Sequence, residues 1–231
     1  MCGRATLTTP PEELAELFGL EPPDVTWSAR YNIAPTQLVA VIVRAATGKR
    51  VLALMRWGLV PSFAEESKGG ERMINLRVES LGRRGMLRET FASRRCLVVV
   101  DGFYEWTHEG ARRGPHYIKR ANGMPMTLAG LWESWRGADG RRLETCAIVT
   151  VPATPPVAHL HDRMPLVVPA ALVDLWLDPS RRTVDDLACV LEARVADGEL
   201  VGYAVHPRVN SPANDGPENI VPFELQRTLF G

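Results

Sequence analysis

The chain has 231 residues and a formal net charge of zero, and 45% of its residues are apolar. That apolar fraction is ordinary for a globular protein and is large enough to fill a substantial core. A neutral chain has no bulk electrostatic attraction for duplex DNA. Its cations are nevertheless biased, with 24 Arg against 3 Lys, a bias that GC-rich coding would also produce. Composition alone therefore establishes no nucleic-acid partner.

The longest apolar run, residues 38–43, is far shorter than the roughly 20 residues of a membrane span. The N-terminus turns polar after Met1-Cys2-Gly3-Arg4 and has no apolar signal core. We therefore expect a cytoplasmic protein that does not enter a membrane. The four cysteines lie far apart without a CxxC pair, which favours free thiols in a reducing compartment.

In chain order, apolar periodicity and turn residues first predict a helix over residues 10–20, with Thr9 as N-cap and Gly19 near its end. Strands over 38–43 and 51–55 follow, joined by a tight turn at 47–49, and then a mobile surface loop over 64–71.

The second half of the chain predicts further strands over 96–100, 117–119, 126–131 and 147–151. Asn122-Gly123 is a typical hairpin turn and should pair 117–119 with 126–131. Helices are expected over 169–176 and 184–196, the second with Thr183 as its N-cap. Many short strands with few helices indicate the α+β class: a curled mixed β-sheet that forms an open pseudo-barrel with a few peripheral helices. No repeat or linker divides the chain, so we expect one domain, 1–231.

Cys2 is the first candidate for chemistry, because loss of Met1 would leave an α-amine and a thiol on one residue. Reference pKa values near 8 and 8.5 give both groups a usable nucleophilic fraction at neutral pH. Such an aminothiol captures aldehydes: the amine forms an imine and the thiol then closes a five-membered thiazolidine ring. For an arbitrary protein a Cys at this position is incidental, so the remaining residues have to support the interpretation.

Polar residues stand where a core would prefer none. Glu105 ends an apolar strand among aromatic residues, and burial there would raise its pKa towards neutrality, as general acid–base catalysis requires. The alternative is a carboxylate paired with one of the many arginines. His161, beside Asp162 and Arg163, could transfer protons at neutral pH. Metal binding by His159 and His161 is disfavoured, because no further ligand follows at a recognisable spacing.

Seven motifs together carry a resemblance. They occur in the order MCGR (1–4), YNIAPT (31–36), WGLVP (57–61), NLRVE (75–79), DGFYEW (101–106), GLWE (130–133) and HDRMP (161–165). In these pieces the chain resembles the SOS response-associated peptidase (SRAP) family, abasic-site-shielding proteins of bacteria with a eukaryotic embryonic-stem-cell counterpart. The resemblance spans residues 2–168. The family usually has small residues where this chain has Leu76 and Val78. The part from 169 to 231 should supply helices and a closing segment, without an assigned function.

The resemblance implies a function: sensing abasic sites in single-stranded DNA, and shielding them by a covalent thiazolidine crosslink as part of the DNA damage response. The implied catalytic residues are Cys2 as the nucleophile, Glu105 as the acid–base group that also takes part in removing Met1, Asn75 as the holder of the amine or a sugar hydroxyl, and His161 as the proton donor at the opened sugar. The implied DNA-binding residues are Arg4, Asn32, Trp57, Arg77, Trp106 and Arg163, with arginines on phosphates and tryptophans stacked on bases. For both tryptophans, core packing is the alternative.

The resemblance implies no cofactor and no metal. It implies a monomer that associates with the nucleoid when bound to DNA, and it leaves open a lyase activity and recruitment by a replication protein. Three other readings remain. The first is a glutamine amidotransferase, a class of enzyme that also begins Met-Cys-Gly. It would need an Asn-Gly pair to hold glutamine, but the only such pair here, Asn122-Gly123, is typical of a turn. A non-covalent single-strand binder would not need Cys2. A peptidase limited to releasing Met1 could share the same site.

Overall fold

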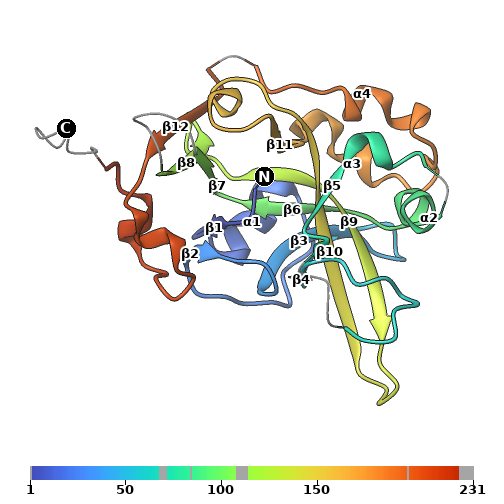
Figure 1. Cartoon of the computed structure of the whole chain (residues 1–231). Coiled ribbons are helices and arrows are strands. Elements are labelled where there is room, and N and C mark those ends of the chain that lie inside the picture. The colour runs from blue at the N-terminus through green and yellow to red at the C-terminus, as the bar shows by residue number, and fades with distance from the viewer. Residues whose placement is uncertain (1, 68–71, 84, 108–113, 197, 224–231) are drawn as a thin grey trace, which may run out of the picture.

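Two β-sheets form the structure (Figure 1), a computed structural model that describes residues 2–67, 72–83, 85–107, 114–196 and 198–223. The first sheet has the strand order β12 (Leu200–Ala204), β8 (Gly114–Arg120), β7 (Gly102–Thr107), β1 (Ala5–Leu7), β2 (Arg30–Ile33). The second has the order β11 (Arg163–Pro165), β10 (Arg142–Pro152), β4 (Arg50–Trp57), β3 (Leu38–Arg44), β6 (Arg95–Val100), β9 (Met126–Arg136), and β5 (Asn75–Arg77) adds to β10.

The second sheet closes on itself because β9 pairs with β10 as well as with β6. The strands β10, β4, β3, β6 and β9 thus form a ring in which only the β10–β4 pairing is parallel. The predicted α+β class with a curled, barrel-like sheet is confirmed, and the barrel is closed where an open one was expected.

Helices are short and lie around the sheets. They are α1 (Pro11–Phe18), α2 (Met86–Ser93), α3 (Val173–Leu177) and α4 (Ala188–Leu191), with 3-10 turns η2 (Val78–Ser80), η4 (Val157–His159), η5 (Ala170–Leu172), η6 (Asp185–Leu187), η7 (Pro207–Asn210) and η8 (Pro217–Ile220). Among the described residues, none of the helices has the length and apolar composition that crossing a bilayer requires.

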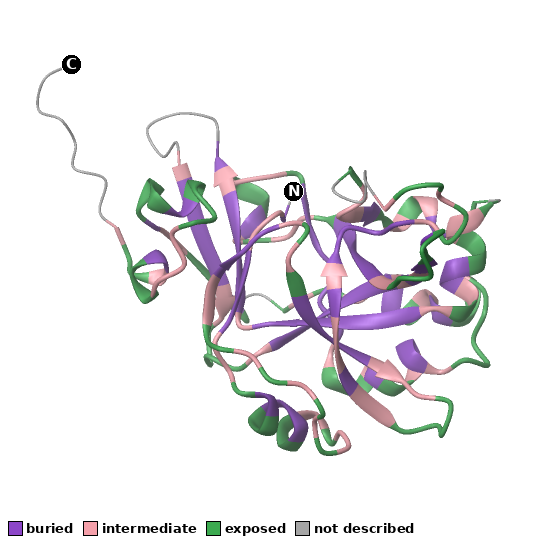
Figure 2. Ribbon diagram, turned by 90° about the horizontal axis from the view of Figure 1, so that it is seen from below, coloured by how far each residue is buried: buried purple, intermediate pink, exposed green. Residues whose placement is uncertain are grey.

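One hydrophobic core joins the two sheets, since residues of β1, β7 and β8 belong to the same buried cluster as residues of the barrel. Figure 2 shows buried residues along the strands of both sheets and exposed residues mainly on connecting segments and outer helix faces. A second, smaller cluster of Tyr104, Tyr117, Val205 and Val209 covers the opposite face of the first sheet. The segment that contains η7 is therefore packed onto this face.

Several local predictions are confirmed. The strands β3 and β4 form the expected antiparallel hairpin, and Gly48 has the positive φ of 83° that its turn requires. Gly19 ends α1 in the left-handed conformation, as a helix C-cap. The strands expected at 96–100, 126–131 and 147–151 are present within β6, β9 and β10.

The prediction of Thr9 as the N-cap of the first helix is wrong. Pro10 holds that position, and the helix is shorter than the range 10–20. Thr9 is occupied elsewhere, because its hydroxyl donates to Asp101 at 2.7 Å and the hydroxyl of Thr8 donates to the same carboxylate. The first helix therefore has no side-chain cap. Thr8 and Thr9 instead bind the N-terminal segment to Asp101, the residue before β7.

The predicted hairpin between 117–119 and 126–131 is also wrong. The Asn122-Gly123 turn is present, with Gly123 at φ +75°, but β8 lies in the first sheet and β9 in the second. Each strand has two other partners, β7 and β12 for β8 and β6 and β10 for β9. A local turn signal reverses the chain without determining which strands pair.

The two helices predicted near the C-terminus are shorter than expected. The range 169–176 becomes η5 followed by α3, and the range 184–196 becomes η6 followed by α4, which ends at Leu191. The hydroxyl of Thr183 does accept a hydrogen bond from the backbone N–H of Asp186, in the manner of a cap. Beyond Leu191 the described residues up to 196 are exposed or half-buried, and Val195 alone among them packs against the core, which is little to stabilise further helical turns. Of the surface loop expected over 64–71, residues 68–71 lie outside the described residues.

The chain crosses from the barrel to the first sheet at Gly102. A Cβ on Gly102 would lie 2.4 Å from the ring of Tyr117 and 2.6 Å from the carbonyl oxygen of Ile118. The ring of Tyr117 is fixed there because its hydroxyl lies 2.8 Å from the hydroxyl of Thr6. Only glycine fits this crossing.

We predict that Gly102→Ala lowers the free energy of unfolding by about 1–3 kcal/mol or more, because the methyl group would overpack against a fixed ring and a backbone oxygen. Urea denaturation followed by circular dichroism measures the loss. The matched control is Gly202→Ala on β12, where the nearest atoms are 3.6 Å from the added Cβ. Equal stability of the two variants would contradict the packing account.

Candidate active site

Cys2 is fully buried where the two sheets meet. Its carbonyl oxygen accepts a hydrogen bond of 2.7 Å from Nδ2 of Asn75, the first residue of β5 in the second sheet. Its thiol faces the carbonyl oxygen of Arg4 at 3.9 Å, and the same oxygen accepts from the backbone N–H of Tyr104 on β7. Cys2 is therefore contacted from both sheets.

Burial raises the pKa of the Cys2 thiol well above its ordinary value, and the negative charge of Glu105 raises it further. The reference value that the sequence suggested for this thiol therefore does not hold in the folded protein. At neutral pH the sulfur is a protonated thiol and needs a base before it can attack. The charge of Glu105 thus acts electrostatically on the sulfur.

Asn75 is positioned by its neighbours on β5. The strand runs parallel to β10, with Asn75 opposite Ile148, and the indole N–H of Trp57 donates to the carbonyl oxygen of Ile74 at 3.0 Å. The Oδ1 atom of Asn75 is buried and has no hydrogen-bond partner among the described residues. A buried acceptor without a partner is costly, so this oxygen is available to an N–H or O–H group of a ligand.

The larger residues beside Asn75 fit the fold. Leu76 is 5% exposed and belongs to the main core, and Val78 packs against the same core from a half-buried position. With Leu76 and Val78 in place of the smaller residues usual in the family, β5 is in register with β10.

Glu105 lies on β7 and is only 2% exposed. In the antiparallel pairing of β7 with β8 it stands directly opposite His116, which is itself buried at 9% exposure. The sequence analysis missed His116. No clear sequence signal marks it, because β8 also carries Lys119 and Arg120, and its relation to Glu105 became visible only with the register of the two strands.

His161 is half-buried and lies between η4 and β11. Its Nδ1 atom is 2.9 Å from the backbone nitrogen of Arg163 and 2.7 Å from Oδ1 of Asp162. The two contacts exclude each other, because the first requires a lone pair on Nδ1 and the second a proton. We assign the backbone bond, since the side chain of Asp162 is 82% exposed and an exposed pair gains little. Nε2 then carries the proton and can donate it to a ligand.

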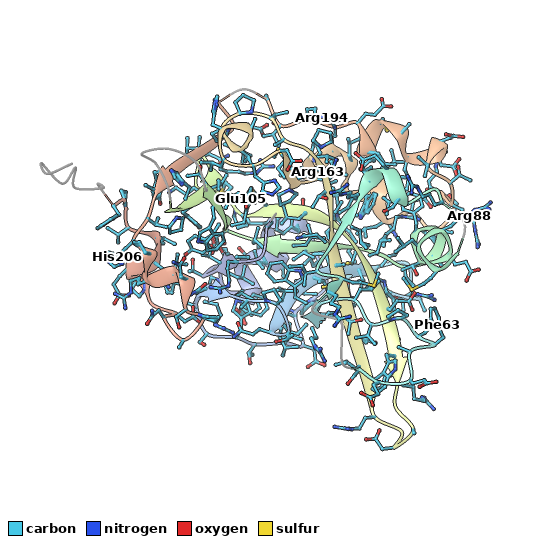
Figure 3. All side chains as sticks on the ribbon, in the orientation of Figure 1. Phe63, Arg88, Glu105, Arg163, Arg194 and His206 are labelled. Atoms are coloured by element: carbon cyan, nitrogen blue, oxygen red, sulfur yellow. The ribbon has the colours of Figure 1, made fainter. Side chains whose placement is uncertain are left out.

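Arg163 is largely used within the protein. Its guanidinium makes a bidentate pair with Glu79 at 2.7 and 3.0 Å and donates to the carbonyl oxygen of Thr150 at 2.6 Å. The hydrogen bonds from Arg163 lower the pKa of Glu79. Figure 3 shows Arg163 and Glu105 in the upper central part of the view, away from Arg88 on α2. Arg77, in contrast, is exposed at the end of β5.

Arg4 and Asn32 fasten the C-terminal segment to the first sheet. Arg4 donates to Oδ1 of Asn32 at 3.0 Å and to the carbonyl oxygens of Val209 and Asn210 at 2.6 and 3.0 Å. Burial lowers the pKa of Arg4. The Nδ2 group of Asn32 donates to the carbonyl oxygens of Val209, Ser211 and Asn214. Asn32 has no exposed surface and therefore supports the site from within.

The two candidate tryptophans have different environments. Trp57 is fully buried, so in this structure its ring has no face for a base to stack on. Trp106 is half-buried, and its indole N–H donates to Oδ1 of Asn210 at 2.8 Å. Asn210 belongs to the C-terminal part to which the sequence assigned no function. That segment therefore borders the site, which the sequence analysis did not anticipate.

Within the described ranges, no three His, Cys, Asp or Glu side chains are grouped so that they could hold a metal ion.

Comparison with known proteins places this arrangement in a family. The sequence profile described as SOS response associated peptidase (SRAP) matches residues 1–212. The chain belongs to the SRAP family. This confirms the resemblance carried by the seven motifs.

The SRAP chain is 34% identical over 223 residues to the abasic site processing protein YoqW of Bacillus subtilis, covering 95% of this chain and 99% of YoqW. It is 31% identical over 209 residues to the abasic site processing protein HMCES of Gallus gallus, covering 78% of this chain and 60% of that protein. A crystal structure of a protein from Bacteroides thetaiotaomicron shares the fold with a TM-score of 0.84 at 20% identity, covering 96% of this chain and 100% of that one. A phage-related protein from Bordetella bronchiseptica matches with a TM-score of 0.67 at 29% identity, covering 88% and 94%.

The burial of Cys2 predicts its reactivity in protein that retains Met1. At pH 7, iodoacetamide should alkylate the exposed Cys189 first, while Cys2, Cys96 and Cys146 react far more slowly because they are buried and their thiol pKa values are raised. Since a raised pKa means less thiolate at pH 7, labelling of Cys2 should accelerate as the pH increases. Peptide mass spectrometry reads each site. Labelling of Cys2 as fast as Cys189 at pH 7 would contradict the geometry.

Proposed function

We propose that this protein processes abasic sites in single-stranded DNA by forming a covalent bond through Cys2 after removal of Met1. The proposal rests chiefly on one observation: Cys2 is fully buried, its carbonyl oxygen accepts a hydrogen bond from Asn75, and the charge of Glu105 acts on its thiol. The relatives named abasic site processing proteins supply the substrate class. An abasic site carries an aldehyde in its ring-opened form, which is the electrophile that an aminothiol captures.

The proposed reaction has two bond-forming steps. The α-amine of Cys2 adds to the aldehyde carbon, and loss of the former carbonyl oxygen as water gives an imine. The sulfur then bonds to the same carbon while the thiol proton passes to the imine nitrogen, which closes the thiazolidine ring. One water is released in total, and no oxidant, reductant or metal takes part.

The raised pKa of the thiol fits this order of events. A protonated, buried thiol competes poorly as the first nucleophile, so the amine attacks first. Glu105, whose charge acts on the sulfur, would accept the thiol proton and deliver protons to the departing oxygen and the nitrogen. The unpaired Oδ1 of Asn75 would accept a hydrogen bond from the amine or from a sugar hydroxyl. The Nε2–H of His161 would serve the opened sugar.

To free the α-amine of Cys2, the Met1–Cys2 peptide bond must be hydrolysed, which consumes one water and releases methionine. The carboxylate of Glu105 is buried and its charge acts on the thiol of Cys2, which supports release within the same site, so that one site would perform both reactions. Met1 itself lies outside the described residues.

For the DNA strand, we assign phosphate contacts to Arg77 and Arg4 and base stacking to Trp106, because these side chains are exposed or half-buried. Arg163 would join them only by exchanging its partner Glu79, which is 51% exposed. Asn32 and Trp57 support the site from the interior. With no net charge to hold a duplex, a single strand that can kink at the lesion is the better substrate.

Cys2→Ser separates imine formation from ring closure. The variant keeps the amine but lacks the sulfur, so we expect it to give only an adduct that needs borohydride trapping, whereas the unmodified protein gives an adduct stable to heat and SDS. Gel electrophoresis with an abasic single-stranded oligonucleotide measures both. The control is Cys189→Ser, an exposed cysteine, which should behave like the unmodified protein. Equal, untrapped stability of the Cys2→Ser adduct would rule out the sulfur.

Glu105→Gln and His161→Ala should differ in which step they slow. Loss of positioned proton transfer typically costs about 10²–10⁴-fold, so Glu105→Gln should slow adduct formation by that order. His161→Ala should change chiefly the rate at which the adduct reverses. Single-turnover crosslinking and reversal rates are measured beside the melting temperature. A stably folded Glu105→Gln protein that crosslinks at the native rate would end the acid–base assignment.

A further inference from the structure

His116 lies next to the carboxylate on which the proposed chemistry depends. The pairing of β7 with β8 places His116 directly opposite Glu105, and directly opposed residues in antiparallel strands have Cβ atoms about 4.5–5.5 Å apart on the same face. Phe103 and Ile118, the opposed pair two residues further along, belong to the main core. Glu105 and His116 therefore point towards the core side, not towards the aromatic cluster around Tyr104.

The described cross-strand neighbours of His116 on β12 carry no charge. On its second side, β12 places Ala204 opposite His116, and Gly202 lies opposite Ile118. The segment that enters η4 crosses this face at Pro156, whose ring atoms are 3.6 Å from a Cβ position on Gly202; His159 and His161 follow that segment. On β7, the titratable residue opposite His116 is Glu105. The charge of Glu105 in turn acts on the thiol of Cys2.

The protonation of His116 follows from its backbone contact. Its Nδ1 atom lies 3.3 Å from the carbonyl oxygen of Gly114. A carbonyl oxygen can only accept, so Nδ1 carries a proton, and in the neutral imidazole the lone pair is then on Nε2. A carboxyl group and an imidazole with this tautomer can hold one further proton between them.

We propose that His116 is a positioning residue that directs the carboxyl group of Glu105 towards Cys2 and shares one proton with it. This inference rests on the proposed function and adds a residue to it. The shared proton lets Glu105 accept the thiol proton and donate to the departing oxygen without exchange with solvent, from which both residues are buried. His116 itself does not contact the reacting atoms.

The test compares single-turnover crosslinking from pH 5 to 9 in the unmodified protein, His116→Phe and His116→Gln. We expect about tenfold slower crosslinking in His116→Phe and loss of the alkaline limb of the pH profile in both variants, because neither side chain titrates. Gln keeps a hydrogen-bond donor, so His116→Gln should recover part of the rate but not the limb. The matched control, His206→Gln, alters an exposed histidine and should leave the profile unchanged. A His116→Phe rate and profile equal to those of the unmodified protein would overturn the proposal, as would an equal change in His206→Gln.

A second measurement requires neither crosslinking activity nor an active His116 variant. NMR titration of the imidazole in the unmodified protein and in Glu105→Gln should show that loss of the carboxylate lowers the pKa of His116 by about one unit or more. The resonance is assigned by its absence in His116→Gln. An unchanged pKa would overturn the pairing. If the unmodified protein forms no adduct, the proposed function fails, and the titration still decides whether the pair exists.

Discussion

The hydrogen bond from Asn75 to the carbonyl oxygen of Cys2 joins the two sheets at the point where the chain begins. On one side, β1 continues from Cys2 into the first sheet and pairs with β7, which carries Glu105. On the other, β5 holds Asn75 against the long strand β10 of the closed barrel. An N-terminal residue is usually poorly ordered, so its burial here requires these fixed partners from both sheets. The crossing at Gly102 and the clamp of Thr8 and Thr9 on Asp101 serve the same junction.

Burial of Cys2 at this junction changes the reactivity of its thiol. It removes water from the thiol, raises its pKa and so keeps the sulfur unreactive towards general electrophiles. Reactivity then depends on neighbouring groups that can take the proton at the right moment. That division explains why a cysteine next to the chain end can be both buried and, in our proposal, the residue that forms the bond to DNA.

Sequence reasoning reached the elements whose signals are local. The β3–β4 hairpin, the Gly19 cap and several strands of the barrel follow from apolar runs and turn residues. Cys2 and Glu105 were named from their unusual positions, and Asn75 from the family resemblance. It failed where partners are chosen over long distances. Nothing in Asn122-Gly123 reveals that β8 and β9 belong to different sheets. Similarly, His116 gained its meaning only from the strand register, and the role of the C-terminal segment only from its bonds to Arg4, Asn32 and Trp106. The burial of Trp57 and the pairing of Arg163 with Glu79 likewise depend on tertiary packing.

The central claim concerns the composition of one covalent product. Intact mass spectrometry after incubation with an abasic single-stranded oligonucleotide measures it directly, because it reports loss of Met1 and gain of DNA in the same species. The account predicts a product whose mass is that of the chain without its Met1 residue plus the oligonucleotide minus one water, formed without a reducing agent. A product that retains Met1, or unmodified protein after complete loss of Met1, would contradict it.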